Sequence, residues 1–272
     1  MSDADACLQN LVESNPLREP VIRSAIQAAK FPVESRGLDV GCGYGAQALL
    51  LAEAVGPAGH VTGLDLCREL LVYAEDMTRQ AGLSDRVSFQ QGDMNALPFE
   101  DNTFDWAWSM DCVGYHPSDP LPSLRELARV VKPGGIVGIA AWSSQQLLPG
   151  YPLLEARLSA TAPGIAPFVQ GKRPEFHFLR ALGWFQALGL EEAEARTFVG
   201  EVSAPLRDDL RRALTALLQV RWEGAQSEVA GEDWAAYQRL CQPESTDFIL
   251  SLPDYYAFFT YTLFRGKVPT AS

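Results

Sequence analysis

Three glycines and three aspartates are the residues of this chain whose spacing could do chemistry. Gly41, Gly43 and Gly45 follow a short apolar stretch and precede a segment rich in Ala and Leu. Glycine has no Cβ, so the backbone can turn sharply there and a ligand can approach the main chain closely. A helix that begins at such a turn points free N–H groups and the positive end of its dipole at the turn. The pattern predicts a nucleotide-type binding site.

The aspartates come in order along the same half of the chain. Asp39 lies inside the glycine motif, Asp65 comes twenty residues after Gly45, and Asp93 comes after the next apolar stretch. A carboxylate at the end of a second strand can accept hydrogen bonds from both hydroxyls of a ribose. Asp93 is placed to accept a hydrogen bond from an exocyclic amine such as that of adenine. Aspartate also forms turns and caps helices, so each acid alone has a structural alternative. Together, at successive strand ends, they favour a nucleotide site.

The elements that must position these residues alternate between strand and helix. Short apolar runs predict strands, and segments with helical spacing lie before and between them. The predicted strands are residues 38–40, 60–65, 86–91, 104–110 and 136–141, and the predicted helices are residues 17–30, 46–55, 67–80 and 121–131. This alternation predicts an α/β fold with a doubly wound parallel sheet and right-handed crossovers.

The second half of the chain has a weaker pattern. Five prolines interrupt residues 143–180, which we expect to form a loop-rich insertion ending in a helix near residues 175–188. Further strands are expected at residues 192–202 and 255–264, and further helices at residues 205–218 and 234–240.

Composition excludes several classes of function. The net charge is −12 and no Lys/Arg cluster interrupts it, which disfavours a nucleic-acid partner. No apolar run reaches the roughly 20 residues of a membrane span, and the acidic N-terminus lacks a signal-peptide pattern. The five cysteines and three histidines are scattered, which indicates neither a disulfide framework nor a metal site. We expect a cytoplasmic protein without a metal; a monomer and a homodimer both remain open.

In combination, these motifs resemble the class I S-adenosylmethionine-dependent methyltransferases, especially the small-molecule type similar to quinone-biosynthesis methyltransferases. The resemblance lies in residues 38–45, 63–65, 91–94, 97–99, 104–105 and 127–135. It implies a seven-stranded Rossmann-like sheet whose last strand, residues 255–264, is antiparallel. It also implies an N-terminal helical lid (residues 1–36), a cofactor-binding core (37–142), and lid insertions with the last two strands (143–272).

The resemblance further implies S-adenosylmethionine as cofactor and S-adenosylhomocysteine as product. The glycine loop would cradle the methionine and ribose, Asp65 would hold the ribose, Asp93 and Met94 would recognise adenine, and residues 109–112 would line the methionine end. The cofactor-binding residues implied in this way are Asp39, Gly41, Cys42, Gly43, Gly45, Asp65, Leu66, Asp93, Met94 and Ser109.

Methyl transfer is an in-line displacement, so the protein mainly places the acceptor and excludes water. A base is needed only if the acceptor must lose a proton. His116, after the fourth predicted strand, is the first candidate because histidine titrates near neutrality; Tyr115 and Asp111 are weaker candidates. A purely structural role in the loop is the alternative for His116.

The acceptor pocket is expected from three segments outside the resemblance, residues 1–30, 143–180 and 205–250. Aromatic residues in or beside these segments favour an apolar or aromatic small molecule, or a cation held against aromatic faces, although the same residues could form ordinary lid core. They are Trp142, Phe168, Phe176, Trp184, Trp222 and Trp234, with His177 as a further candidate for the pocket wall.

Two other functions remain open at this stage. Gly41, Gly43 and Ala46, with an acid about twenty residues on, also satisfy the dinucleotide fingerprint of an NAD-dependent oxidoreductase. Asp93, the turn at residues 132–135 and the lack of a second mononucleotide half argue against it. A sensor or scaffold that binds S-adenosylmethionine without catalysis is the second alternative.

Overall fold

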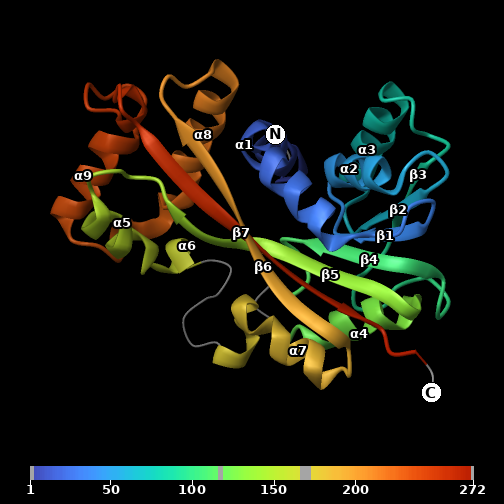
Figure 1. Cartoon of the computed structure of the whole chain (residues 1–272). Helices are drawn as coiled ribbons and strands as arrows, with labels where there is room; N and C mark the ends of the chain where they lie inside the picture. The colour runs from blue at the N-terminus through green and yellow to red at the C-terminus, as the bar shows by residue number, and fades with distance from the viewer. Residues whose placement is uncertain (1–2, 116–118, 166–172, 271–272) are drawn as a thin grey trace.

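A single mixed sheet organises the computed structural model, which describes residues 3–115, 119–165 and 173–270. Its seven strands lie in the order β3-β2-β1-β4-β5-β7-β6 (Figure 1). The strands are β1 (Arg36–Val40), β2 (His60–Asp65), β3 (Val87–Gln91), β4 (Phe104–Met110), β5 (Val131–Gln146), β6 (Glu191–Ser203) and β7 (Tyr256–Lys267). Strands β1 to β5 pair in parallel, and β7 is antiparallel to both β5 and β6. The predicted Rossmann-like sheet with an antiparallel last strand is confirmed.

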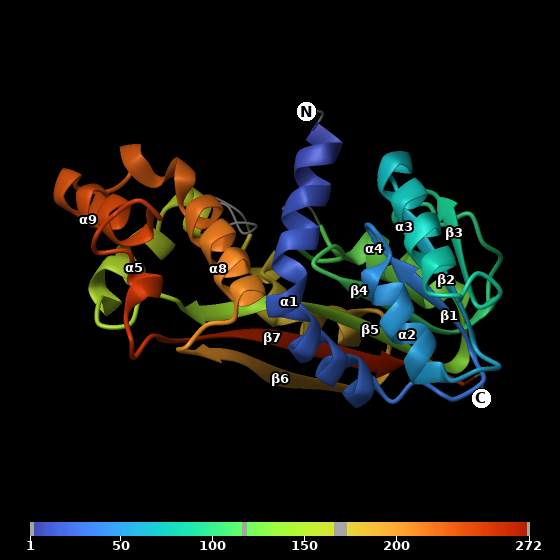
Figure 2. The same cartoon turned by 90° about the horizontal axis from the view of Figure 1, so that it is seen from above.

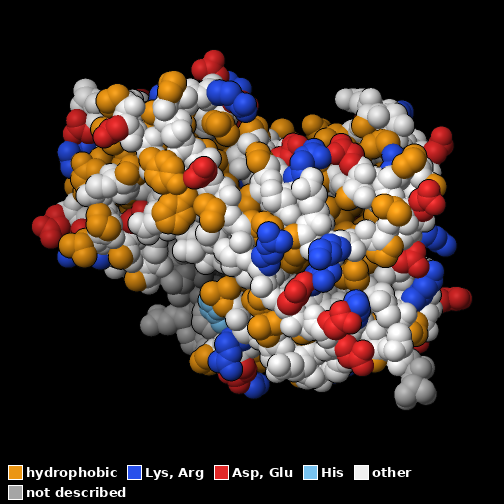
Figure 3. Space-filling view, in the orientation of Figure 1, with side chains coloured by type: hydrophobic (Ala, Val, Ile, Leu, Met, Phe, Trp, Pro, Cys, Tyr) orange, Lys and Arg blue, Asp and Glu red, His pale blue; other side chains and the backbone are white. Residues whose placement is uncertain are grey.

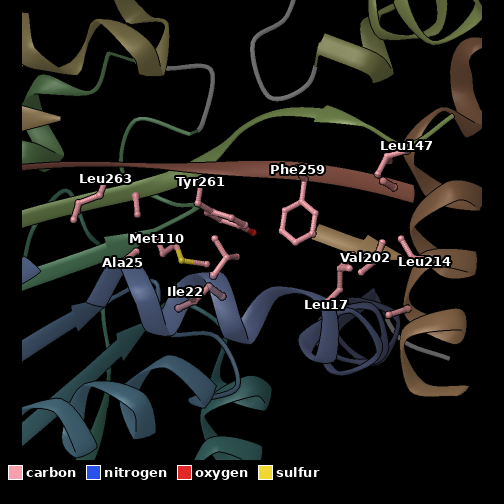
Figure 4. Close-up of a cluster of buried hydrophobic side chains, with 14 of the residues drawn as sticks. Leu17, Ile22, Ala25, Met110, Leu147, Val202, Leu214, Phe259, Tyr261 and Leu263 are labelled. Atoms are coloured by element: carbon pink, nitrogen blue, oxygen red, sulfur yellow. The ribbon is translucent and has the colours of Figure 1, made fainter. Parts of the chain in front are cut away.

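Helices cover both faces of the sheet. On one face lie α1 (Asp3–Ala29), α2 (Ala46–Val55) and α3 (Arg68–Gln80), and on the other lie α4 (Leu121–Val130) and α7 (Ala181–Ala187) (Figure 1). Each face has its own apolar core, because alternate residues of a strand point to opposite sides. In Figure 4, Leu17 and Ile22 of α1 point toward the sheet, where Tyr261 lies on β7, and toward Leu214 of α8.

A second group of helices, the helical lobe, is formed by residues 147–165 and 204–255. It contains α5 (Pro152–Ser159), α6 (Ala162–Ile165), α8 (Asp208–Arg221), α9 (Gly231–Cys241) and the 3-10 turns Glu223–Ser227 and Ile249–Ser251. The lobe gathers around the far ends of β5 and β7, away from α2 and α3 (Figure 2). On the face shown in Figure 3, hydrophobic side chains gather over the lobe, whereas charged ones are scattered over the core.

Helix α1 is longer than the sequence pattern predicts. It begins at Asp3 rather than near residue 17 and continues through Pro16 and Pro20. An interior proline costs a helix roughly 3 kcal/mol. Burial of an apolar side chain stabilises by roughly 1.5–3 kcal/mol, and Leu17, Val21 and Ile22 are all nearly fully buried. The packing of this face against the sheet and α8 therefore outweighs the prolines.

Two further expectations need correction. Strand β5 extends to Gln146 rather than ending at residue 141, because β7 continues to pair with it as far as Gln146. The proline-rich stretch contains α5 and α6, and the helix expected at residues 175–188 is instead two 3-10 turns (Pro174–Phe176 and Phe178–Arg180) followed by α7. Pro152 and Pro174 open their helices, where the missing N–H has no partner to lose.

Candidate functional site

A cavity of about 510 Å³ opens at the carboxyl ends of the central parallel strands. Its wall combines the loop after β1, the start of α2, the end of β2, the turn after β3 and the end of β4. Helix α1 completes the wall from the other side. This is the edge of the sheet at which open α/β folds bind their ligands.

The glycine loop has a backbone that other residues adopt only with strain. Gly41, Gly43 and Gly45 have φ angles of 76°, 54° and 86°. A Cβ at Gly41 would lie 2.5 Å from the Cys112 sulfur, whereas a Cβ at Gly43 would have no atom nearer than 3.8 Å. Gly45 begins α2 without a side-chain cap, so the first turn of that helix retains free N–H groups beside the cavity. The loop is a cradle that fits a polar ligand against the main chain.

Asp65 joins the glycine loop to the end of β2. One carboxylate oxygen accepts from the Gly43 N–H at 2.8 Å, and the other accepts from the Cys67 N–H at 2.9 Å. Each oxygen keeps further acceptor capacity on the side of the cavity, which Asp65 lines together with Leu66. Asp65 can therefore order the loop and accept from a ligand hydroxyl at the same time.

Asp93 and Met94 form the wall after β3. One oxygen of Asp93 accepts from the backbone N–H of Asn95 at 2.8 Å and from its side-chain amide at 3.0 Å. The other oxygen makes no hydrogen bond within the described residues. The Met94 sulfur lies 3.5 Å from the Cys112 sulfur, and both residues line the cavity with Cys42. The arrangement offers one free acceptor beside a soft, polarizable surface.

Three of the predicted cofactor residues, Asp39, Gly45 and Ser109, are not part of the cavity wall. Asp39 is fully buried and neither carboxylate oxygen has a hydrogen-bond partner in the described residues. Burial, and then the charge of Asp65, raise the pKa of Asp39 to about 8. The Ser109 hydroxyl accepts from the Val113 N–H at 3.2 Å, and Gly45 packs against α3 at Ala74. These three residues support the wall from behind.

Asp111, one of the predicted base candidates, lies in the cavity wall but is fully engaged. It forms an ion pair with Arg18, with 2.5 Å between Nη2 and Oδ2, and accepts from the Tyr261 hydroxyl at 3.2 Å. Its other oxygen accepts from the Trp142 N–H at 2.9 Å. Three donors already occupy its two oxygens, so this geometry favours a binding role over proton abstraction.

The other two base candidates are placed differently. Tyr115 lies behind the wall, and burial, then Asp111, raise its pKa, while Arg221 and Arg18 lower it less strongly. His116 lies outside the described residues, as does the aromatic candidate Phe168. His177 is not part of the cavity wall; its Nδ1 accepts from the Leu179 N–H at 3.2 Å, and burial lowers its pKa.

The N-terminal segment was expected to act as a lid, but the individual residues of α1 that line the cavity were not predicted from the sequence. Leu11, Asn15, Arg18 and Ile22 all line it, at the spacing of one helix face. This spacing of three and four residues predicts one helix face, but Pro16 and Pro20 argue against a helix through this stretch of the sequence. Burial opposes the charge of Arg18, yet Tyr261 and Asp111 together raise its pKa above the ordinary value. A charged pair from α1 and β4 therefore closes one end of the cavity.

No group of three or more His, Cys, Asp or Glu side chains in the described ranges is arranged to hold a metal ion. Among the helices of the described part of the chain, none has the length and apolar character needed to cross a membrane.

Comparisons with known proteins agree with this geometry. A family model described as a methyltransferase domain matches residues 38–135. Methyltransferase GfsG of Streptomyces halstedii is 43% identical over 103 residues, which are 38% of this chain but only 36% of that protein. Demethylmenaquinone methyltransferase of Staphylococcus aureus is 30% identical over 185 residues, 62% of this chain and 73% of the relative.

The fold has solved counterparts as well. The crystal structure of the YcgJ protein of Bacillus subtilis superposes with a TM-score of 0.56 at 20% identity, and the match covers 93% of this chain and all of that one (100%). At 20% identity this structural match supports the fold alone. The family model and the curated relatives match the sequence itself, including the motifs that line the cavity. Together they show that the chain belongs to the class I S-adenosylmethionine-dependent methyltransferases of the small-molecule type.

Proposed function

We propose that this protein transfers a methyl group from S-adenosylmethionine to a small organic acceptor with an apolar or aromatic body. The observation that carries the proposal is the cavity of about 510 Å³, walled by the glycine loop, Asp65 and Asp93 and closed by α1. A relative whose name includes a quinone, demethylmenaquinone, supports an acceptor of this kind. Family membership disfavours the dehydrogenase alternative.

In this proposal the cavity residues from the turn after β3 to the end of β4 would hold the cofactor. The oxygen of Asp93 that is not bonded to Asn95 would accept a hydrogen bond from the adenine amine beside Met94, and Asp65 would accept hydrogen bonds from the ribose hydroxyls. S-adenosylmethionine, when bound, supplies a methyl group already activated by its sulfonium. The protein therefore has to orient the acceptor and exclude water, and the proposed reaction needs no metal ion.

We assign the Arg18–Asp111 pair to the methionine end of the cavity. A methionine moiety carries one carboxylate and one ammonium group. Arg18 and Asp111 present one charge of each sign at the wall, and their side chains are only 18% and 19% exposed. Low exposure strengthens such charge-assisted bonds compared with a surface pair. Asp111 thus acts in binding rather than in proton abstraction.

Proton removal, where an acceptor requires it, is proposed for His116. The raised pKa of Tyr115 makes it a hydrogen-bond donor at neutral pH rather than a base. Helix α1 and the helical lobe act as lids that exclude water on the acceptor side. A cytoplasmic location and the absence of a nucleic-acid partner remain predictions from composition.

Transfer of labelled methyl groups tests the proposal. The purified protein is incubated with methyl-labelled S-adenosylmethionine and a small-molecule extract of cells, and label is followed into low-molecular-weight products by mass spectrometry. We expect label in an organic product, and at least tenfold less with Asp65→Ala at the same cofactor concentration. Label confined to protein or nucleic acid, or no transfer into any extract fraction, would contradict the proposed acceptor class.

A further inference from the structure

Arg221, the last residue of α8, has an unusual environment. One terminal nitrogen, Nη2, donates to the Gly164 carbonyl of α6 at 3.1 Å. Its Nε is sealed from solvent and has no partner in the described residues. Its other terminal nitrogen, Nη1, makes no hydrogen bond within the described part of the chain, and it is not sealed in the same way. The guanidinium therefore retains unused donors.

No carboxylate in the described ranges pairs with Arg221. Fourteen ion pairs occur there, and Arg221 takes part in none of them, although the net charge of the chain is −12. The carboxylate that acts on it, Glu155, is buried and accepts from the N–H groups of Leu147 and Leu148 at 2.7 and 2.9 Å. A partly buried cation without a counter-charge is unfavourable unless something else supplies the charge.

Arg221 lies near Tyr115, whose backbone N–H donates to the carbonyl of the cavity residue Cys112 at 3.0 Å. It and Tyr115 lie close enough for each to influence the pKa of the other, and Tyr115 is influenced in the same way by Arg18 and Asp111 of the cavity wall. Tyr115 is therefore near two charged groups, Arg18 of the cavity wall and Arg221 of the helical lobe. Burial lowers the pKa of Arg221, and Tyr115 and Glu155 only partly offset this effect.

We propose that the methyl acceptor is an organic carboxylate, and that its carboxylate binds Arg221 while the Tyr115 hydroxyl donates a further hydrogen bond. This inference rests on the proposed function and narrows its substrate class. A carboxylate fits better than a phosphate dianion because the guanidinium supplies only one positive charge, and Nη1 is its nitrogen with donors open to a ligand. The acceptor would then lie with its acidic end toward the lobe and its methylated atom toward the cavity.

Binding of matched acids and amides tests the inference. The full-length protein is saturated with S-adenosylhomocysteine, and ligand-observed NMR measures binding of 4-hydroxyphenylacetate, indole-3-acetate and octanoate, each against its primary amide. We expect at least one acid to bind about tenfold or more tightly than its amide, because hydrogen bonds to charged groups are the strong ones. Arg221→Met should remove that preference and leave S-adenosylhomocysteine affinity within twofold.

Two controls separate this role from a structural one. Arg212→Met removes an exposed arginine of the same helix and should change neither binding nor melting temperature. Because the partly buried Arg221 cation has no ion-pair partner in the described residues, Arg221→Met should not lower the melting temperature. A drop of more than about 5 °C would mean that Arg221 stabilises the contact between α8 and α6, and it would overturn the inference. Arg221→Lys, which keeps the charge without the guanidinium, should retain part of the acid preference.

The outcomes distinguish this inference from the function on which it rests. If S-adenosylhomocysteine fails to bind the wild-type protein, the proposed function fails first. If it binds but acids and amides bind equally, or if no acid binds, or if Arg221→Met keeps the acid preference, then the carboxylate assignment is wrong while the cofactor site stands.

Discussion

The cofactor cavity and the helical lobe are built from different kinds of interaction. The cavity depends on backbone groups and carboxylates from consecutive strand ends, as in the bonds of Asp65 to the Gly43 and Cys67 N–H groups. The lobe depends on apolar packing between segments far apart in the chain. There Trp222, directly after α8, meets the ring of Tyr237 of α9 edge-on, with 6.2 Å between ring centroids.

This difference separates what the two regions can do. Backbone groups in a glycine loop can bind the same cofactor whichever acceptor is used, because main-chain groups do not change when side chains are substituted. Packed side chains from several helices can change shape with modest substitutions. We infer that changes in the cavity alter cofactor affinity, whereas changes in the lobe alter stability and acceptor choice.

The largest expected effect is on the stability of the lobe. Trp222→Ala removes a fully buried ring and should lower the free energy of unfolding by about 3–5 kcal/mol. Denaturant titration measures this loss, and calorimetry on the folded protein should show S-adenosylhomocysteine affinity within twofold. Trp222→Phe keeps a ring and removes the unpartnered indole N–H, so we expect a much smaller loss. A loss of affinity without a loss of stability would contradict the separation of the regions.

Next in size is a change of the glycine loop. Gly41→Ala would bring a Cβ to 2.5 Å from the Cys112 sulfur and should weaken S-adenosylmethionine binding by about 100-fold or more, roughly 2.7 kcal/mol. Gly82→Ala is the matched control, since its φ is also positive (69°) but no atom lies within 4 Å of its Cβ. Gly82→Ala should lower the free energy of unfolding by about 1 kcal/mol through backbone strain alone and leave the affinity for S-adenosylmethionine unchanged. Equal affinity losses in both variants would refute the role of the close approach.

A third effect concerns the closure of the cavity by α1. Arg18→Met leaves Asp111 without its ion-pair partner and should reduce S-adenosylmethionine affinity about tenfold in calorimetry. Arg23→Met, on the same helix, breaks exposed pairs with Glu19 and Glu53 and should change neither affinity nor stability by more than about 0.5 kcal/mol. A double-mutant cycle with Asp111→Asn should be strongly non-additive. Additive losses would mean that the pair does not act as a unit.

The remaining expected effect is a gain in stability that depends on pH. Burial raises the pKa of the Asp39 carboxyl from its ordinary value of 3.8 to about 8. Between about pH 4 and pH 8 the folded protein therefore keeps the Asp39 proton, whereas the unfolded chain has lost it. Stability contributed by this group is therefore lost as pH rises from about 4 to 8. Asp39→Asn should be more stable than wild type by about 1–3 kcal/mol at pH 8, with no gain near pH 4. Urea titrations across this range measure the gain, and a gain that is independent of pH would contradict the buried, ionising carboxyl.

The same contrast explains what the sequence could predict. The central strands and the glycine loop were predictable because their signals are local: an apolar run, a turn, and an acid at the strand end. The Arg18–Asp111 pair was not, because its partners are 93 positions apart and the prolines of α1 mask the helix that brings them together. The start of α5 at Pro152 was missed for a related reason, since proline opens a helix as readily as it ends one.

Isothermal titration calorimetry with S-adenosylmethionine, S-adenosylhomocysteine and NADH, on wild type and Asp65→Ala, tests the central claim most directly. We expect micromolar binding of the first two ligands and none of NADH. Asp65→Ala should lose both ordering bonds of the glycine loop and at least 100-fold in affinity, with its fold retained by circular dichroism. Unchanged binding by Asp65→Ala, or binding of NADH alone, would contradict the assignment of this cavity to S-adenosylmethionine.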